Sequence, residues 1–165
     1  MMEKQLETLR HLEDVAAGID EYLIYQPLGV FACIAPFNFP FMVPLWFLPY
    51  ALATGNTFIV KPSPKTPISQ TKLFELIDRA GFPPGVVNLV HGGAEVVLTL
   101  IDHPDVVGIA FVGSTPVGRE IYKRCGEKCK RVIAQCGAKN FVVVMPDADL
   151  ERTIPGLLTS FFGNT

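Results

Sequence analysis

The sequence contains no GxGxxG fingerprint, no CxxC unit and no run of basic residues. Because basic runs are absent and the formal net charge is −2, the chain offers no electrostatic surface to nucleic acid or to an anionic membrane. Three scattered histidines and four cysteines without ligand spacing do not form a zinc pattern, so we expect no metal site. These absences exclude nucleic-acid binding, membrane-surface binding and metal catalysis as primary functions.

The cysteine pattern also lacks the spacing of a disulfide framework. Cys125 and Cys129 are one helical turn apart, and Cys33 lies in an apolar, strand-like run. This spacing favours free thiols, which persist in reducing compartments. We therefore expect a cytoplasmic protein.

Neither a leader peptide nor a membrane span is indicated. The first 18 residues are charged and lack the apolar core of a signal peptide. The apolar stretch Phe39–Ala53 has about 15 residues and three prolines, whereas a span needs roughly 20 residues. At 49% hydrophobic residues, either the interior is large or some apolar surface meets another domain or subunit.

Apolar runs alternate with helical stretches along the rest of the chain. Most of these runs are continuously apolar, as in parallel strands that are covered on both faces. The pattern predicts an α/β fold, a Rossmann-like and mainly parallel sheet with helices on both faces. Predicted strands are Gly29–Ala35, Thr57–Lys61, Val86–Val90, Val107–Val112, Arg131–Ala134 and Phe141–Met145; predicted helices are Val43–Thr54, Ser69–Ala80, Ala94–Ile101, Pro116–Glu127 and Leu150–Phe162.

The two ends of the chain differ from this pattern. Residues 1–28 are expected to form a polar helix over the first 17 residues and then an extended run, Glu21–Gln26, without an obvious partner. Residues 29–165 are expected to form the α/β domain. Its last helix runs into Phe161–Thr165 without a cap, so we expect a truncated chain.

Polar residues follow two of the predicted strands at their carboxyl ends, where open α/β sheets collect their ligands. Asn38 lies in the loop Pro36–Pro40 and has an amide that can donate to a developing oxyanion; alternatively, it satisfies the backbone of the turn. Lys61 opens the run Lys61–Pro64 and can donate to a ribose hydroxyl or a phosphate; alternatively, it is an ordinary solvated lysine.

A third motif, Phe111–Gly118, passes from a strand into a Gly-Ser-Thr turn that opens a helix. The unpaired N–H groups and the positive dipole end of the helix suit an anion, and Ser114 adds a hydroxyl. The alternative is a simple Ser/Thr N-cap. A fourth motif, Gln135–Asn140, indicates only a tight turn between two short strands.

In order and spacing, the four motifs resemble the aldehyde dehydrogenase superfamily over nearly the whole chain. PFNFP is similar to the family's PWNFP, KPSP to KPSE, FVGSTPVG to FTGSTEVG, and QCGAK to ELGGK. Several segments, among them GAKNFVVVMPDAD, are closest to the CoA-acylating branch, the methylmalonate-semialdehyde dehydrogenases. The resemblance implies that residues 29–165 are an NAD-binding domain cut before the catalytic domain, and that the full-length protein is a homo-oligomer, a dimer or tetramer.

The resemblance also implies roles for individual residues. Asn38 would stabilise the oxyanion of a thiohemiacetal whose nucleophilic cysteine follows a segment like SFFGNT in the family and is absent from this chain. The cofactor is NAD, with NADP as the alternative. The implied cofactor-binding residues are Ala35 and Phe37 through their backbone atoms, Lys61, Ser63, Pro64 and Lys65 at the adenosine ribose, Gly113, Ser114 and Val117 along the pyrophosphate groove, and Cys136 near the nicotinamide.

Two residues depart from the family pattern. Gln135 replaces the glutamate that activates water in hydrolytic members, and glutamine cannot act as a general base. This favours oxidation of a small semialdehyde, of the malonate or methylmalonate type, with transfer of the acyl group to CoA. A hydrolytic aldehyde dehydrogenase and a binding-only fragment are the alternatives. Pro64 replaces a ribose-binding glutamate, so no nearby acid is expected to repel a 2′-phosphate, and the preference for NAD should be modest.

Overall fold

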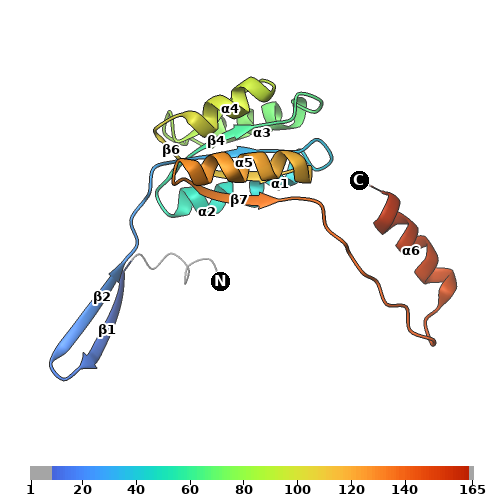
Figure 1. Ribbon diagram of the computed structural model, residues 1–165, viewed down its shortest axis with the longest axis horizontal. Helices are drawn as coiled ribbons and strands as arrows, with labels where there is room; N and C mark the ends of the chain where they lie inside the picture. The colour runs from blue at the N-terminus through green and yellow to red at the C-terminus, as the bar shows by residue number, and fades with distance from the viewer. Residues whose placement is uncertain (1–8, 164–165) are drawn as a thin grey trace.

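The computed structural model describes residues 9–163, which form seven strands and six helices (Figure 1). In chain order the elements are β1 Leu9–Ala16, β2 Ile19–Ile24, β3 Val30–Ile34, α1 Met42–Leu45, α2 Leu48–Ala53, β4 Thr57–Lys61, α3 Ile68–Arg79, β5 Val87–Leu89, α4 Ala94–Asp102, β6 Val106–Val112, α5 Thr115–Glu127, β7 Arg131–Gln135 and α6 Leu150–Phe162.

Five strands form one parallel sheet in the order β5-β4-β3-β6-β7. The chain enters at the central strand, moves outward through β4 and β5, and returns to the other side of β3 with β6. The connection that leaves β3 leads to one side of that strand, and the connection that enters β6 leads to its other side. The position between β3 and β6 is therefore the topological switch point. The predicted fold class is confirmed.

Helices cover both faces of the sheet (Figure 1). Alternate strand residues point to opposite faces, so each face has its own apolar cluster. On one face, Ala32 and Ile34 pack with Leu100 of α4 and Ile121 of α5. On the other face, Cys33 and Ala35 pack with α2, and Phe74 of α3 joins the same cluster. The continuously apolar strands of the sequence are thus explained by burial on two sides.

The helix predicted for the first 17 residues is wrong where the structure describes them. β1 and β2 form an antiparallel hairpin in which Ala16 pairs with Ile19. The connecting turn places Gly18 at φ +72, a left-handed conformation that glycine adopts readily. The extended run at 21–26 therefore has β1 as its partner for most of its length, and residues 1–8 lie outside the described part. The domain division at residue 28 stays a prediction.

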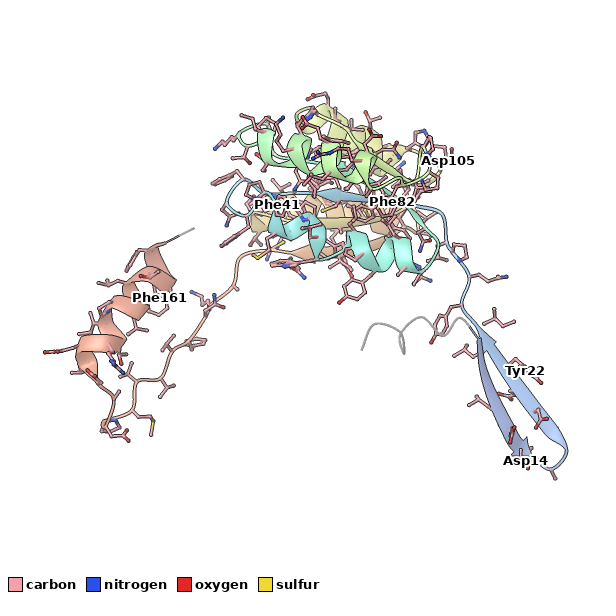
Figure 2. All side chains as sticks on the ribbon, turned by 180° about the vertical axis from the view of Figure 1, so that it is seen from behind. Asp14, Tyr22, Phe41, Phe82, Asp105 and Phe161 are labelled. Atoms are coloured by element: carbon pink, nitrogen blue, oxygen red, sulfur yellow. The ribbon has the colours of Figure 1, made fainter. Side chains whose placement is uncertain are left out.

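Two further predictions differ from the structure. The helix expected over Val43–Thr54 is divided into α1 and α2, because Pro49 has no N–H to donate to the carbonyl of Leu45. The strand expected over Phe141–Met145 is an irregular, exposed segment, since no strand of the described residues pairs with it. It leads to α6, which has no buried residue and stands apart from the sheet, as the labelled Phe161 shows (Figure 2).

Among the helices of residues 9–163, none has the length and apolarity required to cross a bilayer.

The structure orders the four thiols by accessibility, and all four are free. Cys33 and Cys125 are buried, and burial raises the pKa of the Cys33 thiol to about 12 and also raises the pKa of Cys125. Since thiolates are the reactive species, we expect Cys129 to react rapidly with a thiol reagent at pH 8, Cys136 more slowly, and the two buried thiols only after unfolding. A Cys129→Ser variant should lose the fast phase; rapid labelling of Cys33 in the folded protein would contradict the expectation.

Candidate functional site

The parallel sheet brings the four sequence motifs to one edge. Each motif lies at the carboxyl end of a strand: Pro36–Pro40 follows β3, Lys61–Lys65 begins with the last residue of β4, Gly113–Val117 follows β6, and Cys136 follows β7. The first and third of these flank the switch point between β3 and β6. In open α/β folds this crevice is the position at which ligands bind.

The loop after β3 presents Asn38 to solvent. Asn38 is exposed, and within the described residues its side-chain amide has no hydrogen-bond partner. The alternative role, satisfying the turn backbone, is therefore not what holds the loop. Gln70 of α3, which is fully buried, donates from its Nε2 to the carbonyl of Pro40, and Lys65 places its Nζ 4.7 Å from the centre of the Phe37 ring. Both contacts leave the Asn38 amide available to a ligand.

Lys61, at the end of β4, is not a solvated lysine. The residue is only 3% exposed, and its Nζ donates to the carbonyls of Pro62 at 2.7 Å and Gly92 at 3.2 Å. Burial lowers the pKa of the Lys61 ammonium, and the nearby carboxylate of Glu95 partly offsets that effect. Two of the three ammonium hydrogens are used in this way, which leaves one donor for a ligand.

The turn after β6 supplies an uncapped helix terminus. Ser114 is the N-cap residue of α5, but its side chain makes no capping hydrogen bond. The first-turn N–H groups of α5 have no intrahelical acceptor, so this end of the helix can accept an anion. The amide of Gly113 is not available, because it donates to the carbonyl of Gln135 at 3.1 Å. Val117 is 48% exposed beside this terminus.

Cys136 is a packing residue at the end of β7. It is half-buried against the α4–α5 face of the sheet, and its Sγ lies only 2.1 Å from the position that a Cβ at Gly118 would occupy. Gly137 donates to the Oγ1 of Thr115 at 3.2 Å, which ties this loop to the start of α5. The sulfur thus supports the helix whose terminus faces the crevice.

A groove of about 450 Å³ adjoins the β4 motif. It lies between the start of α3 and the loop after β5, and its lining includes Pro64, Ile68, Thr71, His91 and Gly92. Gly92 is also the residue that accepts a hydrogen bond from Lys61. A larger, mainly apolar hollow of about 830 Å³ lies at the amino ends of the strands, around Trp46, Tyr50 and Ile133. None of its lining residues belongs to the four motifs, so it is not the candidate site.

The loop after β5 was not predicted as part of the site. Its sequence, His91-Gly92-Gly93, passes from a strand into the first turn of α4 in the same manner as the Gly113-Ser114 turn passes into α5. A pair of glycines between a strand and a helix was the available signal. The roles assigned to the individual site residues stay predictions. Among the residues that the structure describes, no cluster of three His, Cys, Asp or Glu side chains is suited to a metal ion.

Known proteins share both the sequence and the fold of this chain. The family model for the aldehyde dehydrogenase family matches residues 1–165. Malonate-semialdehyde dehydrogenase 1 of Oceanobacillus iheyensis is 53% identical over 154 residues, which are 93% of this chain and 32% of that protein. The chain thus spans about a third of the length of this curated relative.

Two crystal structures extend the comparison. One, from Sinorhizobium meliloti 1021, is described as a methylmalonate-semialdehyde dehydrogenase complexed with NAD; it has a TM-score of 0.89 and 41% identity over 98% of this chain and 33% of its own. The other, an NADP-dependent enzyme of E. coli, has a TM-score of 0.86 and 38% identity over 94% of this chain and 33% of its own. The chain belongs to the aldehyde dehydrogenase family.

Proposed function

We propose that the chain is the cofactor-binding part of an NAD-dependent semialdehyde dehydrogenase that transfers its acyl product to CoA. The supporting observation is the convergence of the four motifs at the carboxyl edge of the sheet, with a free Asn38 amide on one side of the β3–β6 crevice and the uncapped α5 terminus on the other. The NAD complex of the structural relative supports the choice of cofactor.

In this proposal the dinucleotide lies across the carboxyl edge of the sheet. The first-turn N–H groups of α5 and the Ser114 hydroxyl would donate hydrogen bonds to the pyrophosphate. The remaining Lys61 hydrogen donates to the adenosine ribose, and the 450 Å³ groove beside Pro64 receives the adenosine. Ala35 contributes its carbonyl, because its N–H already donates to the carbonyl of Lys61 at 3.0 Å. Bound NAD supplies the hydride acceptor.

The chemistry needs a thiolate that adds to the aldehyde carbon, and this addition places a negative charge on the aldehyde oxygen. In this proposal the Asn38 amide donates a hydrogen bond to that oxygen. None of the four cysteines suits the thiolate role: two are buried with raised pKa values, Cys136 packs on α5, and Cys129 follows the far end of α5. We therefore propose that the nucleophile comes from polypeptide other than these 165 residues, and that the chain alone binds without catalysing.

Gln135 supports CoA as the acyl acceptor. Hydrolysis requires a general base that activates water, and the exposed amide of Gln135 cannot remove a proton. Loss of hydride from the thiohemiacetal to NAD would leave an acyl thioester on the enzyme sulfur. A CoA thiolate would then attack the thioester carbonyl and release the enzyme thiolate, so that acyl-CoA is the product. The malonate-semialdehyde dehydrogenase relative supports a small semialdehyde as the substrate. The full-length protein is proposed to be a homo-oligomer.

Binding by variants at Lys61 tests the cofactor assignment. Lys61→Met keeps most of the buried stem and removes the ammonium, so NAD binding should weaken by about 1–3 kcal/mol, the range for a charged hydrogen bond to a ligand.

A variant at Pro64 tests whether the same loop contacts the ribose. Pro64→Glu should shift selectivity toward NAD, because a carboxylate accepts a hydrogen bond from the ribose and repels a 2′-phosphate. Calorimetric titration with NAD and NADP measures both effects.

The matched control is Lys123→Met, which removes an exposed ammonium from α5. Unchanged NAD affinity in Lys61→Met, with the fold intact by circular dichroism, would assign Lys61 a purely structural role. An unchanged NAD/NADP ratio in Pro64→Glu would show that this loop does not contact the ribose.

A further inference from the structure

Glu95 lies in the first turn of α4 and was not among the predicted site residues. Its Oε1 accepts a hydrogen bond from the backbone N–H of Gly93 at 2.8 Å. The N–H of Glu95 itself and this bond from Gly93 lower the pKa of the carboxyl group, and Lys61 lowers it further. Glu95 is therefore an anion at neutral pH, held against the loop that follows β5.

A single peptide group connects Glu95 with Lys61. The carbonyl of Gly92 accepts from the Lys61 Nζ at 3.2 Å, and the N–H of the same peptide, which belongs to Gly93, donates to Glu95. The cation and the anion thus occupy opposite ends of one peptide dipole, roughly 8 Å apart at most from standard bond lengths. Each charge polarises the peptide in the direction that strengthens the other hydrogen bond.

The orientation of this peptide depends on Gly92. Its φ of +154 is a conformation that other residues seldom adopt, and a Cβ at this position would lie 2.2 Å from the Cγ2 of Val96. The backbone at Gly92 therefore holds its carbonyl toward Lys61 and the following N–H toward Glu95. The backbone peptide between Gly92 and Gly93 therefore positions both charged groups.

The other charges around the groove are already paired or directed elsewhere. Lys72 and Glu75 form an ion pair at 2.8 Å on α3. Lys65 lies over the ring of Phe37, in the loop after β3. The charge that acts on Lys61 is that of Glu95. Glu95 thus places an acid near Lys61 that the sequence did not indicate, and this acid comes from α4 and not from the loop after β4.

We propose that Glu95 is a specificity-determining residue that favours NAD over NADP. This inference rests on the proposed function, in which Lys61 holds the adenosine ribose. A 2′-phosphate that approached the Lys61 ammonium would bring almost two negative charges close to the Glu95 carboxylate. The neutral 2′-hydroxyl of NAD meets no such repulsion. Glu95 thereby replaces, from another element, the acidic group that the sequence lacks at position 64.

The test compares Glu95→Gln with the unaltered 165-residue chain in titrations with NAD and with NADP. Glutamine keeps an oxygen that can accept from Gly93 and removes only the charge. Affinity for NADP should increase about tenfold, as expected when a like charge within roughly 8 Å is removed near a protein surface. Affinity for NAD should change less than about twofold. The NADP gain should shrink at high salt, since exposed charges are screened.

The matched control is Glu127→Gln, which makes the same change in net charge at the C-terminal end of α5, away from the crevice. A fall in the NAD/NADP ratio in Glu95→Gln alone supports the proposal. A ratio that is equal in all three proteins, with NAD bound normally, overturns the proposal and leaves the proposed function intact. Failure of the unaltered chain to bind either dinucleotide contradicts the proposed function itself.

Discussion

Replacement of Asn56 by alanine is expected to lower the free energy of unfolding by about 2–4 kcal/mol. Asn56 is 8% exposed, and its side chain makes four hydrogen bonds. Its Oδ1 accepts from the N–H groups of Leu28 at 2.7 Å and Gly29 at 3.1 Å. Its Nδ2 donates to the carbonyl of Ala51 at 3.3 Å and to the Oγ1 of Thr54 at 2.8 Å.

The size of the effect follows from what alanine would leave behind. Asn56 links the end of α2 with the starts of β3 and β4, and the N–H groups of Leu28 and Gly29 would lose their acceptor in a part-buried environment. Thr54→Ala is the control, because it removes one exposed partner of the same network and should lower stability by less than about 1 kcal/mol. Urea denaturation followed by circular dichroism measures both. Equal losses in the two variants would contradict the assignment.

Replacement of Gly118 by alanine is expected to lower the free energy of unfolding by about 1–3 kcal/mol and to weaken dinucleotide binding. A Cβ at this position would lie 2.1 Å from the Sγ of Cys136 and 3.2 Å from the ring of Phe111. Relief of the overlap requires the Cys136 side chain or α5 itself to move, and a shift of α5 would displace the helix terminus at the crevice. Gly118 is therefore a spacing residue between α5 and the end of β7.

A second substitution makes the cause identifiable. Cys136→Ala removes the sulfur, so the double variant should recover most of the stability that Gly118→Ala loses. Gly126→Ala is the control within the same helix, because a Cβ there meets no atom within 4 Å; it should be neutral or slightly stabilising, as alanine favours helix. A double variant as unstable as Gly118→Ala alone would show that the sulfur does not set the spacing. Thermal and urea unfolding measure the set.

The parts of the fold that local sequence determines were predictable. β4 and α6 have the predicted bounds, and β6 differs by one residue. The strands could be recognised because both faces of the sheet are covered, which makes each strand apolar throughout. The parallel arrangement then placed Asn38, Lys61 and Ser114 at one edge without knowledge of any side-chain contact.

Features that depend on tertiary contact were not predictable. The charged residues of β1 suit a helix locally, and only pairing with β2 decides for a strand. Lys61 follows a strand like any surface lysine, and its burial depends on Gly92, thirty-one residues later. Glu95 is a usual acidic residue of a first helical turn, and its relation to Lys61 requires both the β4–β5 pairing and the conformation of Gly92.

The order of strands in the sheet also has a consequence for synthesis on the ribosome. β3 is made first among the sheet strands, and β4 and β5 complete only one of its sides. Its other side waits for β6, which follows α4 in the chain. During that interval the nascent sheet presents an apolar strand with unpaired backbone donors and acceptors, the kind of edge that recruits foreign strands. Pairing of Val106–Val112 with β3 closes that edge, so we expect the yield of folded protein to depend on how soon this pairing occurs.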